Sequence, residues 1–247
     1  MPEHELWVTA LFNKMFAGST TPILQKLGVP PENPAHPWSN FVAMEVLVAL
    51  LIVLLFALLR PRLSMDRPGK LQHVGELIFG FVSGQTDDVV GRHGRPYMAF
   101  FGTILLFVLF SNLLGIVPTL ESPTMFAPVP LGCALATFCY YNFVGLRALG
   151  PFGYLKHFAG PVWWLALLMF PIEIISNLAR LLSLTIRLFA NMFAGEQVIL
   201  AFMSLVPLVI PLPFMGLHIF VGFVQAYIFF LLTMVYVGEV LPHEAEH

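Results

Sequence analysis

Long apolar runs are the feature that most constrains the fold of this chain. A membrane-spanning helix needs about 20 apolar residues, and the 247-residue sequence, which is 58% hydrophobic and 11% charged, contains several runs of about that size. Soluble domains carry a larger charged share than this. The sequence therefore predicts an all-α, polytopic integral membrane protein that is surrounded by lipid.

Proline, glycine and basic breaks divide the chain into a single membrane domain with five membrane segments. We expect spans at residues 38–60, 96–118 and 129–146, a long helix at 162–205 and a last helix at 214–240. Residues 61–95 mix polar and apolar positions and are expected to form an amphipathic helix on the inner membrane surface. Residues 1–37 are expected to be an N-terminal segment on the outer side.

The fourth segment is too long to cross a membrane upright. If wholly helical, residues 162–205 would extend on the order of 66 Å, against a hydrocarbon thickness of about 30 Å. We therefore expect the last two helices to be long and tilted, with a kink near Pro171 as an alternative or an addition to the tilt.

Basic residues are distributed unevenly among the loops. Of the 12 Lys and Arg residues, eight lie in the loops after the first and third spans, whereas the N-terminal segment holds only Lys14 and Lys26. Cytoplasmic loops carry the excess of basic residues. The distribution predicts a multi-pass protein with its N-terminus outside and its C-terminus in the cytoplasm. The compact length is typical of a bacterial inner-membrane protein, with an organelle-encoded homologue as the alternative.

A polar stripe follows one face of the long fourth segment. At about 100° per residue, seven polar side chains fall within an arc of roughly 120°. Charge within a bilayer costs roughly 2.5 to 3.5 kcal/mol per residue, so such residues mark ion pathways. The stripe consists of Glu173, Ser176, Asn177, Arg180, Ser183, Arg187 and Asn191.

The charged members of this stripe have two explanations. Glu173 and Arg180 lie near the basic-side interface, where pairing for packing and a role in ion transfer are both open. Arg187 lies in the middle of the run without an acidic residue three or four positions away, so no helix neighbour neutralises it. Because arginine stays protonated, Arg187 suits a fixed positive charge rather than a proton carrier.

Two titratable residues flank the proline-rich turn before the last helix. Glu196 lies about 180° around the helix from Arg187, and His218 is at a similar distance on the other side of the turn. We expect them to be neighbours across the hairpin and to relay protons; the alternative is that His218 is a packed, hydrogen-bonded histidine. Steps of seven place His218, Gly222, Gln225, Phe229 and Tyr236 on one face.

Several functions are excluded by what the sequence lacks. The eight histidines are scattered and no metal-binding motif, glycine-rich phosphate loop or nucleophile elbow appears, so we expect no metal, no cofactor and no covalent chemistry in this chain. A formal net charge of -2 without a basic tract gives no reason to expect nucleic acid.

Specific motifs resemble one family. The sequence SLTIRLFANMFAGE, from Ser183 to Glu196, resembles the signature S-L-x-x-R-L-F-[GA]-N-[MI]-x-A-G-[EH] of subunit a of F-type ATP synthases. The turn NLLGIVP, which begins at Asn112, resembles the family's N-L-x-G-x-[IV]-P turn. His218, Gln225 and Tyr227 resemble its last helix.

The resemblance implies a role for each matched residue. Arg187 is then the essential arginine that faces the rotating ring of c subunits, with Ser183 and Asn191 beside it. Polar residues of the outer aqueous half-channel are then Glu196, His218, Asn112 and Gln225. The implied function is proton translocation by the stationary channel subunit of ATP synthase, which provides two half-channels to the ring and has no catalytic chemistry of its own.

The resemblance also implies the partners, namely the c-subunit ring, the b-subunit stator stalk, membrane lipid and, through the complex, the soluble ATPase head. Two other readings remain as alternatives. A secondary transporter usually shows two related halves, and no internal repeat is seen here. A proton-conducting subunit of a respiratory complex typically carries several lysines within its spans, whereas this chain has none there.

Overall fold

The computed structural model describes residues 6–26, 36–64, 69–117, 119–159, 166–205 and 210–241, and these parts are mostly helical and contain no strand. Three short 3-10 helices, η1 (Arg60–Arg62), η2 (Arg92–Tyr97) and η3 (Pro123–Met125), lie between the longer ones. The α-helices are α1 (Trp7–Lys26), α2 (Asn40–Leu59), α3 (Lys70–Val89), α4 (Met98–Leu114), α5 (Pro128–Ala159), α6 (Ala166–Leu205) and α7 (Pro211–Val240).

Five helical segments of the described chain are long and apolar enough to cross a membrane. They are Asn40–Leu59, Arg92–Leu114, Pro128–Tyr154, Leu167–Leu205 and Pro211–Val240. This finding confirms the predicted all-α class with five membrane helices. Helix α3, which follows the first of them, is not among the five.

The helix boundaries differ from the expected ones in three places. Helix α1 lies within residues 1–37, where the sequence predicted no helix. Helix α7 begins at Pro211 instead of residue 214, because a proline in the first turn has no N–H to leave unbonded. Helix α5 continues past residue 146 and breaks at Gly150, whose φ of 71° favours glycine.

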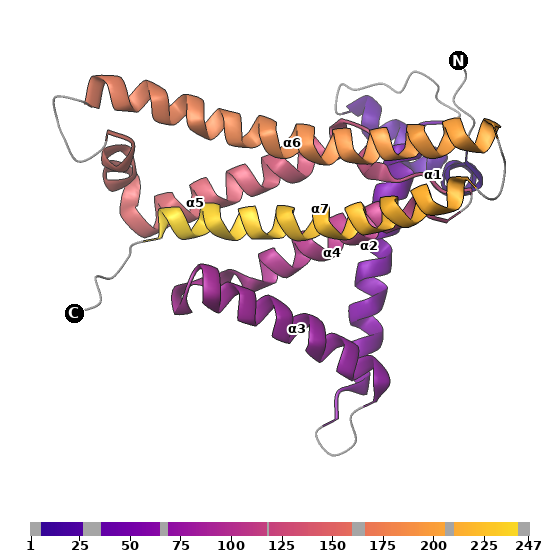
Figure 1. Cartoon of the computed structure of the whole chain (residues 1–247), viewed down its shortest axis with the longest axis horizontal. Helices are drawn as coiled ribbons and strands as arrows, with labels where there is room; N and C mark the ends of the chain where they lie inside the picture. Colours follow the sequence, from indigo (N-terminus) through magenta and orange to yellow (C-terminus); the bar gives the residue numbers. More distant parts are fainter. Residues whose placement is uncertain are drawn as a thin grey trace.

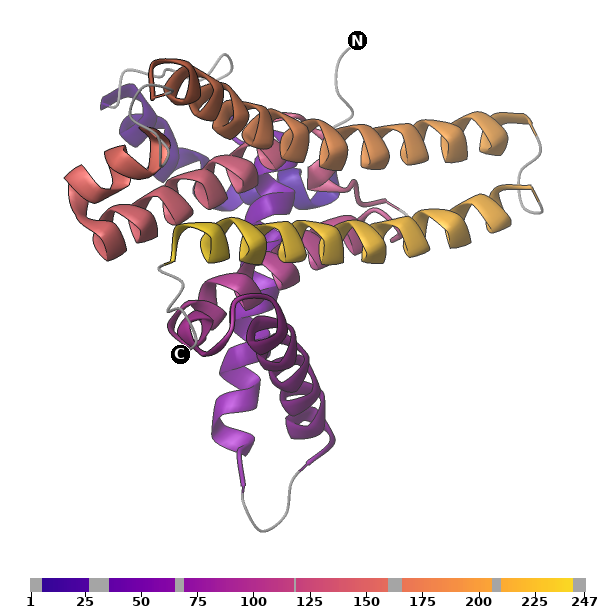
Figure 2. The ribbon, with the colours of Figure 1, turned by 60° about the vertical axis from the view of Figure 1, so that its left-hand side comes forward.

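Helices α6 and α7 form an antiparallel pair that determines the shape of the molecule. They lie side by side along their length and run across the direction of α2 (Figures 1 and 2). At their connected ends the rings of Phe202 and Phe214 stack with centroids 4.4 Å apart. Helix α6 continues through Pro171 without interruption, so it accommodates its length by inclination relative to α2 and not by a break.

Two apolar clusters hold the described helices together. The larger one joins α4, α5, α6 and α7, and its fully buried members include Phe101, Val108, Leu188, Met192, Phe229 and Phe230. The smaller one attaches α2 to α1 and α4 through Val8, Met44, Val48, Ile52, Leu106 and Leu114. The α6–α7 pair is thus backed by α4 and α5, while α2 and α3 extend from the other side of α4 (Figure 1).

Candidate functional site

The polar residues of α6 lie in two different environments along the helix. We name the part around Arg180, with Glu239, Tyr236, Tyr141 and Asn177, the Arg180 end. The part around Glu196, with Gly195 and His218, is the Glu196 end. Arg187 lies between the two.

Side chains at the Arg180 end are paired. Arg180 forms an ion pair with Glu239 of α7, and its guanidinium carbon lies 5.3 Å from the ring centroid of Tyr236. The hydroxyl of Tyr141 donates to the Oδ1 atom of Asn177, whose Nδ2 donates to the backbone oxygen of Glu173 at 3.0 Å. For Arg180, the geometry favours the packing explanation over a direct role in ion transfer.

Glu239 is a partner that sequence reasoning missed. It lies 59 residues from Arg180 in the chain, beyond any local spacing rule. The available signal was the position along the hairpin: when α6 and α7 run antiparallel, the end of α7 lies opposite the first half of α6. Glu239 is the only acidic residue of α7, so it was the one candidate there.

Arg187 differs from Arg180 in having no such partner. Its side chain is half-buried and makes no ion pair or hydrogen bond with any residue in the described ranges. Leu184 and Leu188 on either side are buried in the core, whereas Ile186 is 59% exposed. Arg187 therefore lies at the edge between the bundle and an exposed apolar face of α6.

One turn further along, α6 and α7 are joined by amides. The Nδ2 atom of Asn191 donates to Oε1 of Gln225 at 3.0 Å, while the Nε2 atom of Gln225 is buried and has no partner among the described residues. Ser183, which lies about one turn before Arg187 along the helix, is exposed. The two residues expected to flank the arginine thus differ, since of the two only Asn191 forms a hydrogen bond with a described residue of α7.

Glu196 and His218 meet at one cavity, as their positions around the hairpin predicted. This cavity has a volume of about 260 Å³ and is lined by both side chains together with residues 115–117, Thr119 and Leu120. His218 is only 6% exposed, and neither of its ring nitrogens finds a hydrogen-bond partner in the described part of the chain. Its imidazole lies directly against Gly195, where a Cβ atom would overlap Nδ1. The structure thus brings the two residues together; their roles remain a prediction.

Asn112 is placed elsewhere, in a buried hydrogen-bond network. Its Nδ2 donates to the backbone oxygen of Gly222 at 3.0 Å, and its Oδ1 accepts from the hydroxyl of Thr124 at 2.7 Å. Thr124 in turn contacts Ser122, whose hydroxyl donates to the backbone oxygen of Ser111 at 2.9 Å. Sequence reasoning missed Ser122 and Thr124, because the short η3 helix has no recognisable periodicity. Asn112 fastens α4 to α7 and does not line the Glu196 cavity.

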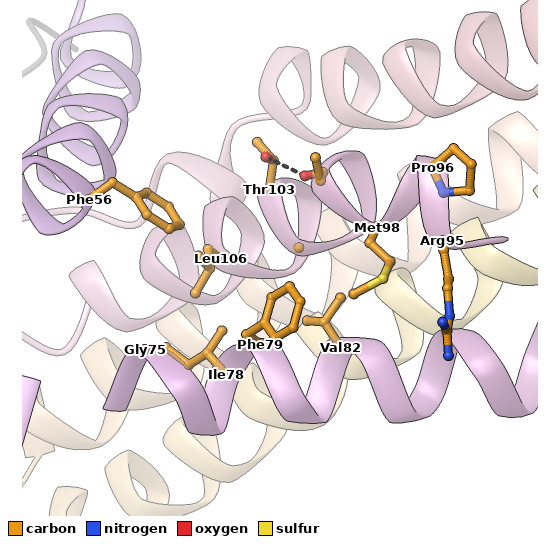
Figure 3. Close-up of a pocket in the computed structure, with 12 residues that line it drawn as sticks. Phe56, Gly75, Ile78, Phe79, Val82, Arg95, Pro96, Met98, Thr103 and Leu106 are labelled. Carbon is orange, nitrogen blue, oxygen red and sulfur yellow. Dashed lines mark hydrogen bonds between the residues drawn. The ribbon is translucent and has the colours of Figure 1, made fainter. Parts of the chain in front are cut away.

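A larger cavity of about 530 Å³ lies away from these residues, between α2, α3 and α4. Figure 3 shows Phe79 and Val82 of α3 facing Leu106 of α4 across it, with Arg95 at one end. Arg95 is bound to Asp87 through two hydrogen bonds of 3.1 and 3.0 Å, and its guanidinium lowers the pKa of the Asp87 carboxyl. This cavity is apolar along most of its wall.

No group of three His, Cys, Asp or Glu side chains that could hold a metal ion occurs in the described ranges. What the site offers is instead a fixed charge midway along a long membrane helix and a titratable pair in a cavity beyond it. Ionisable residues in this setting mark ion pathways. The fold and the site together define a polytopic membrane protein of the ion-translocating class.

Comparisons with known proteins identify which member of that class this is. The family model described as ATP synthase A chain matches residues 42–238. The chain belongs to this family. It is 57% identical to "ATP synthase subunit a" of Solibacter usitatus over 95% of this chain and 100% of that protein. It is 52% identical to the protein of the same name from Koribacter versatilis, over 97% of this chain and 98% of that one.

Membership gives the function at the level of the complex. The chain is a non-catalytic, multi-pass membrane subunit of ATP synthase and contributes the proton channel of its membrane sector. The readings as a secondary transporter or as a respiratory-complex subunit are not favoured. The resemblance noted from the SLTIRLFANMFAGE motif is thereby confirmed.

Proposed function

We propose that Arg187 is the charge that separates two proton half-channels and attracts the deprotonated carboxylate of each passing c subunit. The observation that carries this proposal is the absence of any ion-pair or hydrogen-bond partner for Arg187 among the described residues, midway along α6. An unpaired arginine retains its full charge for an external carboxylate and repels free cations. Protons then cannot leak straight across, and each must travel around with the ring.

The outer half-channel reaches Arg187 from the Glu196 end. The cavity shared by Glu196 and His218 supports this assignment, because it is large enough for water and its mostly apolar wall carries these two polar side chains as partners. Gln225 continues the path toward Asn191 and Arg187, with a buried amide nitrogen available to a water. Asn112 supports the path from behind by holding Gly222 of α7.

The exposed face of α6 supports the c-subunit ring as the partner. Large apolar side chains cover this face on both sides of Arg187: Ile175 at 66%, Leu178 at 53%, Ile186 at 59% and Phe193 at 42% exposure. The b-subunit stator stalk and, through the complex, the soluble ATPase head complete the set of partners. In the bacterial inner membrane, the distribution of basic residues supports an N-terminus outside and a C-terminus in the cytoplasm.

The membrane potential drives the cycle, at about 2.3 kcal/mol per charge per 100 mV. A proton that enters by the outer half-channel neutralises a c-subunit carboxylate, which then passes through lipid without a charge. After nearly a full turn the proton leaves by the inner half-channel. Arg187 receives the carboxylate that has just lost its proton.

Substitution of Arg187 tests the proposal. Inverted membrane vesicles that carry Arg187→Ala should make no ATP in response to a proton gradient, although the complex assembles. Arg187→Lys should also fail to support normal synthesis, because a compact ammonium neither spreads its charge nor holds its proton as firmly when desolvated. Synthesis at the parental rate in either variant would refute the proposal.

A further inference from the structure

The Arg180 end contains an ion pair that the proposed proton path does not use. Arg180 and Glu239 come from different helices and lie at the edge of the bundle, with side chains 25% and 45% exposed. The guanidinium also lies over the ring of Tyr236. The pair is therefore close enough to the surface to be met by a partner that moves along α6.

Arg180 and Arg187 project from nearly the same face of α6. They are seven residues apart, and steps of seven return to within about 20° on a helix, so the two levels are separated by about 10 Å along its axis. Helix α6, all of which is described, contains no other Lys or Arg. Without Glu239, this face would present two cations of equal charge in succession.

We propose that Glu239 neutralises Arg180 so that α6 presents one free cation, Arg187, to the carboxylates of the c-subunit ring. This inference rests on the proposed role of Arg187. With Arg180 paired, a deprotonated carboxylate has one position of lowest energy along the helix, next to the outer half-channel. With Arg180 free, a second attractive position opens about two turns away. Glu239 is then a positioning residue that acts on the ring through Arg180.

The size of the effect follows from the separation of the two arginines. A unit charge about 10 Å away, at an effective dielectric constant of about 20, changes a rate on the order of tenfold. Part of that effect is screened by salt, since Arg180 is partly exposed. A purely mechanical clamp between α6 and α7 would lack this dependence on ionic strength.

The test compares Glu239→Gln with the double change Arg180→Gln and Glu239→Gln in inverted vesicles that contain the whole synthase. Glutamine keeps the size of the Glu239 side chain and removes its charge; at position 180 it removes the charge together with the guanidinium that lies over Tyr236. We expect Glu239→Gln to slow ATP synthesis and ATP-driven proton pumping on the order of tenfold, with the complex fully assembled. The double variant should return to within about twofold of the parent, and high salt should recover part of the Glu239→Gln loss.

Two results would overturn the inference. One is parental activity in Glu239→Gln. The other is a loss that the double variant does not repair, whether or not the complex assembles, since that would make the pair a structural clamp. Arg187→Ala in the same vesicles separates this inference from the proposed function: if Arg187→Ala stops synthesis while Glu239→Gln has no effect, only the role of Glu239 is refuted.

Discussion

The two ends of the α6–α7 pair differ in whether their polar side chains find partners within the protein. At the Arg180 end, Arg180 is paired with Glu239 and Asn177 with Tyr141. At the Glu196 end, both ring nitrogens of His218 are buried without a partner in the described chain, beside a cavity that Glu196 shares. One end is satisfied by protein alone, whereas the other leaves room for water.

This difference separates structural from transport roles. A buried polar group without a hydrogen bond costs about 1–3 kcal/mol, so a protein that serves only stability would pair it. The paired Arg180 end has its charges neutralised within the protein. The Glu196 end leaves both nitrogens of His218 without a partner among the described residues, as the proposed exchange of protons with water requires.

In the comparison of the two ends, the largest effect on proton flux is expected from removing the titratable groups of the Glu196 end. Glu196→Gln and His218→Ala should each lower passive proton flux by on the order of a hundredfold, the contribution of a positioned proton-transfer group. Because the two residues share one cavity, the double change should cost less than the two separate losses combined. Flux is measured through membranes stripped of the ATPase head.

An exchange variant provides the control for this pair. With His at 196 and Glu at 218, the same titratable groups occupy the same cavity, so part of the flux should return. Strictly additive losses, together with an inactive exchange variant, would remove the pair from the pathway and leave His218 as a packing residue.

A smaller effect, about tenfold, is expected from crowding the cavity without removing a titratable group. Gly195→Ala adds a Cβ atom that overlaps the imidazole of His218, so the ring must move, at a cost of about 1–3 kcal/mol. Gly216→Ala is the matched control, because a Cβ atom there meets nothing within 4 Å. If both variants conduct protons equally well, the position of His218 is not critical.

Asn112 should affect stability more than transport. Asn112→Ala removes its hydrogen bonds to Gly222 and Thr124 and leaves both partners buried, at a cost of about 1–3 kcal/mol. The assembled membrane sector should therefore unfold at a lower temperature in detergent, with proton flux reduced less than in Glu196→Gln. A normal unfolding temperature combined with blocked flux would instead assign Asn112 to the half-channel itself.

The smallest effect is expected at the exposed ion pair outside the α6–α7 pair. Asp87→Asn breaks the contact with Arg95 and should leave ATP synthesis within about twofold of the parent, as exposed pairs contribute little. The pKa of Asp87 is lowered in the folded protein, chiefly by its hydrogen bond to Arg95. The contribution of the Asp87–Arg95 contact to the stability of the folded protein is thus present above the unfolded pKa of about 3.9. It is lost as the pH falls through the folded pKa.

Thermal unfolding at two pH values checks the sign of this effect. Parent and Asp87→Asn should differ most near neutral pH and converge as the pH falls through the lowered folded pKa of Asp87, where the parental carboxyl becomes protonated as well. A large transport defect in Asp87→Asn would show that any broken ion pair impairs the complex, and would weaken the interpretation given to Glu239.

The sequence predicted the helices well where composition and periodicity are strong. Residues 38–60 and 96–118 are mostly apolar, and α2 and α4 lie within them. It predicted less where the determinant is a single backbone angle or a short helix. The break at Gly150 depends on one positive φ, and α1 lies in a segment with only a modest apolar pattern.

For the site, too, the sequence predicted what local spacing determines and missed what the packing of separate helices determines. The proximity of Glu196 and His218 could be predicted, because both positions are fixed by their distance from one turn. The pairing of Arg180 with Glu239 and the network of Asn112 with Thr124 could not, since each depends on how separate helices pack. The same is true of the contrast between Arg180 and Arg187, which look alike in the sequence.

The sparse attachment of α2 bears on how the protein is made. This helix buries only six of its 20 residues in the described structure, and most of its apolar surface is left to lipid. It can therefore enter the bilayer as soon as it leaves the ribosome, before any partner exists. Helix α6, with two arginines and two glutamates, lacks that independence. Insertion thus begins with the helix that needs no neighbour, and α6 enters only after α4 and α5 are available to receive it.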